Sequence, residues 1–355
     1  MGATSLLLFP AFFGWAGVAV FFAVSGFCIH LSHQRSRSKG YQVYFLRRFF
    51  RIYPPYFLAL LIFECLLRFP STWLGKDHDF AHLIDSVGDL LTHLFLVHNF
   101  SKTYFFGTIN GVFWSVAVEA QLYALYPLLL WLTLRLGWRR TLWLTALVEI
   151  GLRSFDALSV VSNSPHSLPQ VLSGSPLYFW FSWTIGAALA DAWLKAGPLP
   201  FRQAWGWLWP VLFLASYFFK PSYPYAFTLA ALSSTYLMSW CLSRPNHAWT
   251  VNGWLKVPLE HLRWAGMVSY SAYLLHQPIL NTVPRIISII FHHHPIPTLV
   301  MYGFCLLAWF PIFGLSYLFY RYVEQPSIAW GKTVIARTQH TNSPLDPTLS
   351  AIPSP

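Results

Sequence analysis

The sequence predicts an all-α, polytopic transmembrane domain with about nine membrane spans and a cytoplasmic C-terminus. The composition is the first reason: 55% of the 355 residues are hydrophobic and only 10% are charged, whereas soluble domains carry roughly 25% charged residues. The second reason is the alternation of long apolar runs with short basic segments. The third is an aromatic content of 19%, as expected when Trp and Tyr line both membrane interfaces.

Nine apolar segments are candidates for membrane-spanning helices, each of which needs about 20 apolar residues. They are residues 6–30, 50–69, 117–134, 140–153, 176–194, 205–219, 224–242, 264–290 and 298–320. The run 87–97 is too short to cross the bilayer and contains His93, so we expect an interfacial or re-entrant helix there. Residues 1–335 then form one transmembrane domain. The tail 336–355 is rich in Pro, Ser and Thr, so we expect it to be disordered.

Basic residues gather where the first span ends, in a segment without a carboxylate. They are Arg35, Arg37, Lys39, Arg47, Arg48 and Arg51. Because Lys and Arg accumulate on the cytoplasmic side of membrane spans, this pattern predicts a cytoplasmic elbow between the first two spans. Arg47 and Arg51 are four residues apart and share a helix face, which we expect to meet an anionic group. The alternative is a topology signal that contacts lipid headgroups.

The distribution of charge supports this orientation and indicates the partners. Nine spans place most of the 23 Lys and Arg residues on the side of the elbow, together with the C-terminus. The same arrangement puts Met1 outside, as in a chain that has lost an opening helix. The basic residues flank apolar runs instead of forming one patch, so we expect the lipid bilayer as a partner and no nucleic acid. The four cysteines lie in apolar segments without CxxC spacing, which predicts no disulfide and no metal site.

Glu119 is the strongest candidate for a functional residue among the charged residues within the expected spans. It lies near the outer end of its span, in the segment WSVAVEAQLYALYP, where a charge is costly and is a functional candidate by default. Glu119 and Tyr123 share a helix face, and Ser115 lies four residues before Glu119. The alternative is a structural carboxylate at the membrane interface that is hydrogen-bonded to Tyr or Trp.

His276 is the second candidate. In the segment VSYSAYLLHQPIL, Ser269, Tyr273 and His276 fall on one helix face. Pro278 is expected to kink the helix and to free backbone carbonyls that could line a polar cavity. The alternative is a hydrogen-bonded histidine inside the protein core.

Other polar residues are expected to have local roles. We expect His30 to mark the inner interface. Glu149 and Asp191 should pair with a nearby Arg or Lys, and Arg321 should pair with Glu324 three residues later.

Four segments in order resemble the acyltransferase 3 family of integral membrane acyltransferases. They are GVAVFFAVSGF followed by RRFFRIYPPY, then WSVAVEAQLYALYP, SYSAYLLHQPIL and RYVEQP, and together they extend from about residue 14 to 330. The resemblance implies a ten-helix membrane domain. It also implies transfer of an acyl group, usually acetyl, from a cytoplasmic coenzyme A thioester to a hydroxyl of a cell-surface glycan, a lipid-linked sugar or a similar acceptor. No tightly bound cofactor is implied, since acyl-CoA (acetyl-CoA) is a co-substrate.

The resemblance also assigns roles to residues of this chain. Arg47, Arg48 and Arg51 fall on the inner arginine motif that is implicated in coenzyme A binding, and a guanidinium fork suits phosphate oxygens. Glu119 falls on the glutamate at the outer end of the cavity and His276 on the late histidine, so these two are the catalytic candidates. The expected substrate-cavity residues are Ser25, Trp114, Ser115, Tyr123, Ser269 and Tyr273.

The chain departs from the family pattern in two places. The family opens with a helix that carries an arginine and a histidine taken as the catalytic base, and this sequence begins in the loop after that helix. Ala120 stands where the family often has a second glutamate. We therefore expect either a start codon placed too far downstream or a catalytically inactive relative.

Two other functions remain open at this point. A transporter or flippase of a polar lipid or sugar also uses intramembrane Glu and His residues and a kinked helix, and an inactive relative could have a structural or regulatory role. The motifs favour a bacterial inner (plasma) membrane.

Overall fold

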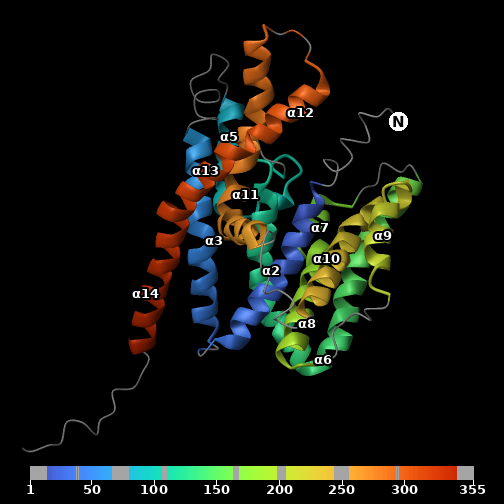
Figure 1. The fold of residues 1–355 in the computed structure, drawn as a ribbon. Coiled ribbons are helices and arrows are strands. Elements are labelled where there is room, and N and C mark those ends of the chain that lie inside the picture. Colours follow the sequence, from blue (N-terminus) through green and yellow to red (C-terminus); the bar gives the residue numbers. More distant parts are fainter. Residues whose placement is uncertain are drawn as a thin grey trace, which may run out of the picture.

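The all-α class is confirmed: the regular structure of the described residues is helical, without a strand (Figure 1). The structure is a computed structural model that describes residues 14–36, 38, 40–65, 80–105, 110–162, 168–197, 205–243, 256–292, 294 and 296–341. The basic residues Arg37 and Lys39 of the expected elbow lie outside this range, as does the beginning of the expected span 6–30.

The helices follow one another as a bundle with short additional turns. The α-helices are α2 (Ala16–Arg35), α3 (Tyr41–Phe63), α5 (Phe80–Leu94), α6 (Phe113–Val161), α7 (Gln170–Ser173), α8 (Trp180–Leu194), α9 (Leu208–Ala215), α10 (Ala226–Leu242), α11 (Lys256–Ile290), α12 (Thr298–Leu307), α13 (Trp309–Phe319) and α14 (Gln325–Thr341). Short 3-10 turns are η3 (His98–Phe100), η4 (Pro176–Phe179) and η5 (Lys220–Tyr225), and η7 (Tyr320–Glu324) is a π-helical turn.

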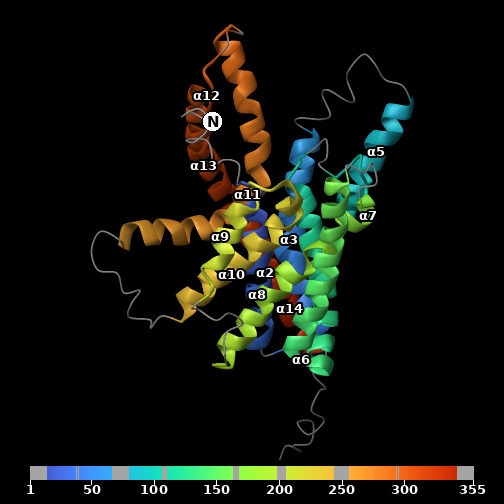
Figure 2. The same ribbon diagram turned by 90° about the vertical axis from the view of Figure 1, so that its right-hand side faces the viewer.

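Several chain reversals lie at one end of the bundle, which we call the elbow end. The end of α2, the reversal of α6 at Gly137 and the end of α8 border one cavity there, and α14 also runs toward this end (Figure 1). The other end, called the opposite end, holds the beginning of α2 and the turns η4 and η5. Figure 2 shows that α11 is bent and that its C-terminal part extends beyond the bundle together with α12. Pro278 and Pro284 lie inside α11, and each removes a backbone hydrogen bond there.

The segment α6 consists of two helices that fold back on each other at Gly137. This glycine has a φ of 76°, a left-handed conformation that glycine adopts without steric cost. Trp114 and Arg153, one from each half, both approach the ring of Phe179 at 5.6 Å. In one continuous helix they would be about 58 Å apart. The two separate segments expected at 117–134 and 140–153 are therefore present as an antiparallel pair.

Two glycines allow α2 and α8 to pack at backbone contact distance. A Cβ atom at Gly26 would lie 2.0 Å from the carbonyl oxygen of Trp183, and one at Gly186 would lie 1.9 Å from that of Ala23. Helices in membranes commonly use small residues in this way, because packing and not water exclusion holds them together. The close contact places Ser25 of α2 beside Trp183 of α8.

Helix lengths agree only in part with the expected spans. Among the described residues, α2 and the continuous helical stretch Thr298–Gln339 are long and apolar enough to cross a membrane. The expected span 205–219 is wrong as a single spanning helix, because α9 has only eight residues, about 12 Å. The residues on either side of α9 form turns, and Pro221 and Pro224 occur in η5. The count of nine spans stays a prediction.

Two segments are helical over more residues than expected. The helix α3 begins at Tyr41, nine residues before the expected span 50–69, so the arginine motif lies within the helix. The helix α14 continues to Thr341, so residues 336–341 are helical, which corrects the expectation of a tail that is disordered from 336. The rest of that tail lies outside the described residues.

A buried histidine pair between α5 and α6 predicts a dependence of stability on pH. His93 and His98 are fully buried with ring centroids 3.8 Å apart, and burial, together with repulsion from His93, lowers the pKa of His98 to about 3. An unfolded chain protonates this histidine near pH 6.5. Between these pH values the unfolded state binds more protons, so stability falls as the pH is lowered. Thermal unfolding at pH 4.5 should show a loss of roughly 2–3 kcal/mol relative to pH 7.

The controls are two histidine substitutions. His98→Asn should reduce this pH-dependent loss, whereas the same change at the exposed His294 should leave it as in the unmodified protein. An identical pH dependence in His98→Asn would contradict the assignment.

Candidate functional site

A buried polar cluster lies between α2, α6 and α8. The carboxylate of Glu119, only 4% exposed, accepts a hydrogen bond from Ser25 Oγ at 3.0 Å and another from the hydroxyl of Tyr123. Trp183 Nε1 donates to Ser25 Oγ at 3.4 Å. Glu119 and Tyr123 meet because they are four residues apart on one helix face. The structure thus brings together three residues that the sequence marked separately as catalytic or cavity-lining.

Two of the three arginines of α3 lie within electrostatic range of this cluster. Arg48 and Arg51 both interact electrostatically with Glu119. Arg48 is 9% exposed and its terminal nitrogen donates to Ser32 Oγ at 3.0 Å, while its Nε has no hydrogen-bond partner among the described residues. A buried unpaired donor of this kind calls for an explanation. A bound anionic group would supply one.

The third arginine has a different environment. Arg47 donates to Ser36 Oγ at 2.6 Å, at the elbow end. Arg47 and Arg51 were expected to face one anionic group. Arg51 interacts electrostatically with Glu119, whereas Arg47 is hydrogen-bonded to Ser36 at the end of α2.

Residues of α11 reach the same region from another side. The hydroxyl of Tyr273 is hydrogen-bonded to Ser115 Oγ, one turn before Glu119 on α6. His276 is oriented through its Nδ1, which donates to the carbonyl of Tyr273 at 2.8 Å, and its ring stacks on Trp309 with centroids 5.9 Å apart. A histidine that donates through Nδ1 keeps a lone pair on Nε2 and can accept a proton there.

Two of the expected cavity residues do not join the cluster. Ser269 is exposed and donates to the carbonyl of Gly266 in its own helix, at 2.8 Å. Trp114, at the beginning of α6, packs between Phe105 and Phe179, with ring centroids 5.3 and 5.6 Å away.

A second polar network near the elbow end was missed by the sequence reasoning. His30 is 1% exposed; its Nε2 bonds to Asp191 Oδ1 at 3.2 Å, and Tyr126 donates to its Nδ1 at 3.0 Å. Asp191 also pairs with Lys195 at 2.9 Å, as expected from the sequence. A cavity of about 400 Å³ borders His30 and Asp191. The sequence held one signal for this network: His30 and Asp191 are polar residues in apolar helices, and such residues require polar partners.

The carboxylate of Glu149 forms the third network. It pairs with Arg153 at 3.2 Å, which confirms the expected local ion pair, and it also accepts hydrogen bonds from Ser182 and Thr228. Arg153 donates further to the carbonyls of Tyr178 and Pro224, both at 2.8 Å. One ion pair thereby connects the second half of α6 with α8, α10, η4 and η5.

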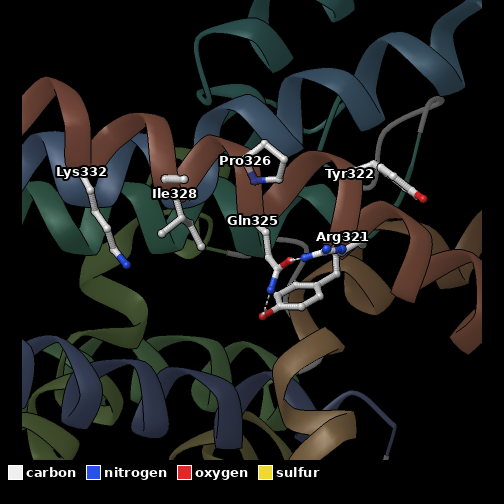
Figure 3. A pocket seen from close by; sticks show the side chains of 8 residues that line it. Arg321, Tyr322, Gln325, Pro326, Ile328 and Lys332 are labelled. Carbon is white, nitrogen blue, oxygen red and sulfur yellow. Dashed lines mark hydrogen bonds between the residues drawn. The ribbon is translucent and has the colours of Figure 1, made fainter.

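The expected pair between Arg321 and Glu324 is wrong. Figure 3 shows Arg321 directed toward Gln325, to whose Oε1 it donates at 3.0 Å. Glu324 is buried and accepts a hydrogen bond from Ser271 of α11 at 2.7 Å. The π-helical turn η7 changes the helical register there and separates the two side chains. The adjoining open cavity of about 640 Å³ in Figure 3 is lined by η7 and α14 alone and does not include the cluster around Glu119.

Comparisons with known proteins identify a family and three similar proteins. Residues 2–321 match the model of a family described as "Acyltransferase domain". The chain is 25% identical to "Putative peptidoglycan O-acetyltransferase YrhL" of Bacillus subtilis, over 91% of this chain and 52% of the relative. It is 23% identical to "Peptidoglycan O-acetyltransferase OatA" of Listeria monocytogenes, over 78% of this chain and 46% of the relative.

A third similarity is shorter. "Nodulation protein 10" of Rhizobium leguminosarum is 29% identical over 38% of this chain and 36% of the relative. The chain spans about half the length of the two peptidoglycan O-acetyltransferases. No solved structure matches the chain significantly. Within the described residues, no three metal-binding side chains lie close enough together to hold a metal ion.

Proposed function

Because this chain belongs to the acyltransferase family whose model matches residues 2–321, we propose that it transfers an acyl group to a hydroxyl of a glycan. The donor is acyl-CoA with acetyl as the acyl group, and the acceptor is a cell-surface glycan, a lipid-linked sugar or a similar molecule. The buried cluster of Ser25, Glu119 and Tyr123, with Arg48 and Arg51 close by, carries this proposal. It combines a buried carboxylate and buried hydroxyls with one buried and one exposed arginine.

The arginines of α3 are the proposed donor site. Coenzyme A carries phosphate groups, and guanidinium groups bind phosphate oxygens with two parallel hydrogen bonds. Within the described part of the chain the Nε–H of Arg48 has no hydrogen-bond partner, and Arg51 is exposed on the same helix. Arg47 at the elbow end is suited to contact the outer part of the same molecule. In this proposal the elbow end faces the cytoplasm, where acyl-CoA is available.

The chemical step requires a base and a place for the developing charge. His276 Nε2 is the proposed acceptor of the proton from the acceptor hydroxyl. The hydroxyl oxygen then attacks the thioester carbonyl, the carbon–sulfur bond breaks, and the thiolate of coenzyme A leaves and takes up a proton. Glu119 orients the acceptor or the base, and the hydroxyls of Ser115 and Tyr273 are donors near the reacting carbonyl.

The proposed setting is a lipid bilayer, with the acceptor approaching from the opposite end. The apolar composition and the two described helices of spanning length support this placement. The two similar peptidoglycan O-acetyltransferases come from bacteria, which supports a bacterial plasma membrane. Tyr and Trp residues around the bundle suit its two interfaces.

Substitution of Arg51 tests the donor site. We expect Arg51→Ala to raise the KM for acetyl-CoA by about 10- to 100-fold, the loss expected for a charged hydrogen bond worth about 1.5–3 kcal/mol. The measurement is transfer of radiolabelled acetyl from acetyl-CoA to glycan acceptors by the purified chain in lipid nanodiscs.

The matched control is Arg321→Ala, since Arg321 is exposed and donates a hydrogen bond to Gln325. This control should leave the KM unchanged. An unchanged KM in Arg51→Ala would remove the arginine assignment. Absence of coenzyme A binding, together with movement of a polar lipid or sugar across the membrane, would favour a transporter.

A further inference from the structure

A separate cavity of about 310 Å³ opens at the opposite end of the bundle. Such a volume falls at the lower end of the range of small-molecule sites. The beginning of α2, the second half of α6, the turns η4 and η5 and the beginning of α10 form its wall. Its lining includes Trp15, Arg153, Asp156, Tyr178, Tyr223 and Phe227.

Aromatic rings form the apolar part of the wall. The ring of Trp15 lies 6.3 Å from that of Phe227 in a stacked arrangement and 6.2 Å from that of Tyr223. Tyr223 is 55% exposed, so part of its ring remains uncovered. The faces of aromatic rings carry a negative partial charge. They therefore attract C–H bonds that are polarised by neighbouring oxygen atoms.

Polar groups with unused hydrogen-bonding capacity complete the wall. Asp156 accepts hydrogen bonds from the hydroxyl of Tyr178 at 2.6 Å and from the backbone N–H of Leu168 at 3.3 Å. A carboxylate has about four acceptor sites, so about two remain. Arg153 uses three N–H groups for Glu149, Tyr178 and Pro224, and a guanidinium has five. Both groups are held in place by these bonds before any ligand arrives.

We propose that this cavity binds one sugar ring of the acceptor glycan, an inference that rests on the proposed function. A pyranose ring presents C–H groups on its faces and hydroxyls around its rim, which fits aromatic walls beside a fixed donor and a fixed acceptor. An acyl chain would cover the half-buried carboxylate of Asp156 without giving it a new hydrogen-bond partner, which is costly. An anionic ligand would meet the carboxylate of Asp156.

The bound ring differs from the ring that receives the acyl group. Along α2, Trp15 precedes Ser25 by ten residues, which corresponds to about 15 Å. Phe22 of α2 lies three residues before Ser25 and packs against Phe179 and Phe227 of the cavity wall. Binding of a distant ring holds a long acceptor in position for reaction at the cluster. Oligosaccharides are therefore better acceptors than monosaccharides.

The test measures binding of a tetramer of N-acetylglucosamine to the full chain in nanodiscs, without acetyl-CoA, by calorimetry. We expect Tyr223→Ala to weaken binding about tenfold, because the change removes the exposed aromatic ring against which one face of the sugar packs. Tyr223→Phe keeps the ring and should retain binding. Tyr322→Ala removes an exposed tyrosine of η7, far from the cavity wall, and should also retain it.

The outcomes separate this inference from the proposed function. No binding by the unmodified chain, or equal binding by Tyr223→Ala, would overturn the sugar site. Acetyl transfer to the tetramer measured in parallel reports on the function. If acetyl transfer occurs but Tyr223→Ala changes neither binding nor KM, the cavity is not the sugar site and the proposed function stands. Binding that depends on Tyr223 but is not followed by transfer would leave the sugar site and remove the function.

Discussion

Glu119→Gln is expected to lower acetyl transfer about 100-fold or more without unfolding the protein. Glutamine has the same shape and still accepts the hydrogen bond from Ser25, so the packing around the cluster is retained. The change removes the negative charge that faces Arg48 and Arg51. Loss of a group that takes part in proton transfer or in its orientation costs about 10²–10⁴-fold in rate. The rate of transfer from saturating acetyl-CoA in nanodiscs is the measurement.

The matched control makes the same substitution at an exposed position. Glu260→Gln lies on the surface of α11 and should transfer acetyl at the normal rate. Melting temperatures of both variants should stay close to that of the unmodified chain. A rate in Glu119→Gln within a factor of two of normal would show that Glu119 is a structural carboxylate, the alternative that the sequence left open.

Glu149→Ala should have the largest effect on stability. Glu149 is fully buried and accepts hydrogen bonds from Arg153, Ser182 and Thr228. Its removal leaves the buried guanidinium of Arg153 without its counter-ion, and breaking a buried pair in this way costs about 3–5 kcal/mol. We expect a strongly lowered melting temperature in detergent, or failure to accumulate in the membrane.

Two variants distinguish the effect of losing this buried ion pair from a general loss of stability on substituting charged helix residues. Glu149→Gln keeps an oxygen for Ser182 and Thr228 and should be milder than alanine. Lys195→Ala breaks a pair of the same i, i+4 spacing, but the Lys195 side chain is 69% exposed, so its loss should cost less than about 1 kcal/mol. Similar melting temperatures for Glu149→Ala and Lys195→Ala would contradict the central role of Glu149.

The sequence predicted most of the helices because apolar runs report burial directly. The separation of 117–134 from 140–153 follows from basic residues between two apolar runs, and the structure has a reversal at Gly137 between them. The prediction failed where the length and continuity of a helix depend on local turns of the backbone. The segment 205–219 is apolar enough for a span, yet its helix stops after eight residues. The arginine motif looked like part of an elbow but belongs to α3.

The candidate site was predictable as a set of residues and only partly as an arrangement. Glu119, Tyr123 and Ser115 share one helix, so their spacing alone placed them together. Contacts between helices gave no comparable signal. The bond from Ser25 to Glu119 depends on how closely α2 packs, and that depends on glycines whose neighbours lie far away in the chain.

The sequence by itself determined the all-α class and marked one carboxylate and one histidine as functional candidates. Helical periodicity and the cost of burying a charge were enough for this, because each can be read from a single segment of the chain. The tertiary structure alone decided which polar groups meet. Asp191 bonds both His30 and Lys195. Glu324 accepts a hydrogen bond from Ser271 of another helix, and Arg321 bonds Gln325. The physical reason is that a buried polar group must be satisfied by whichever partner the packing brings near. That partner commonly lies on another helix.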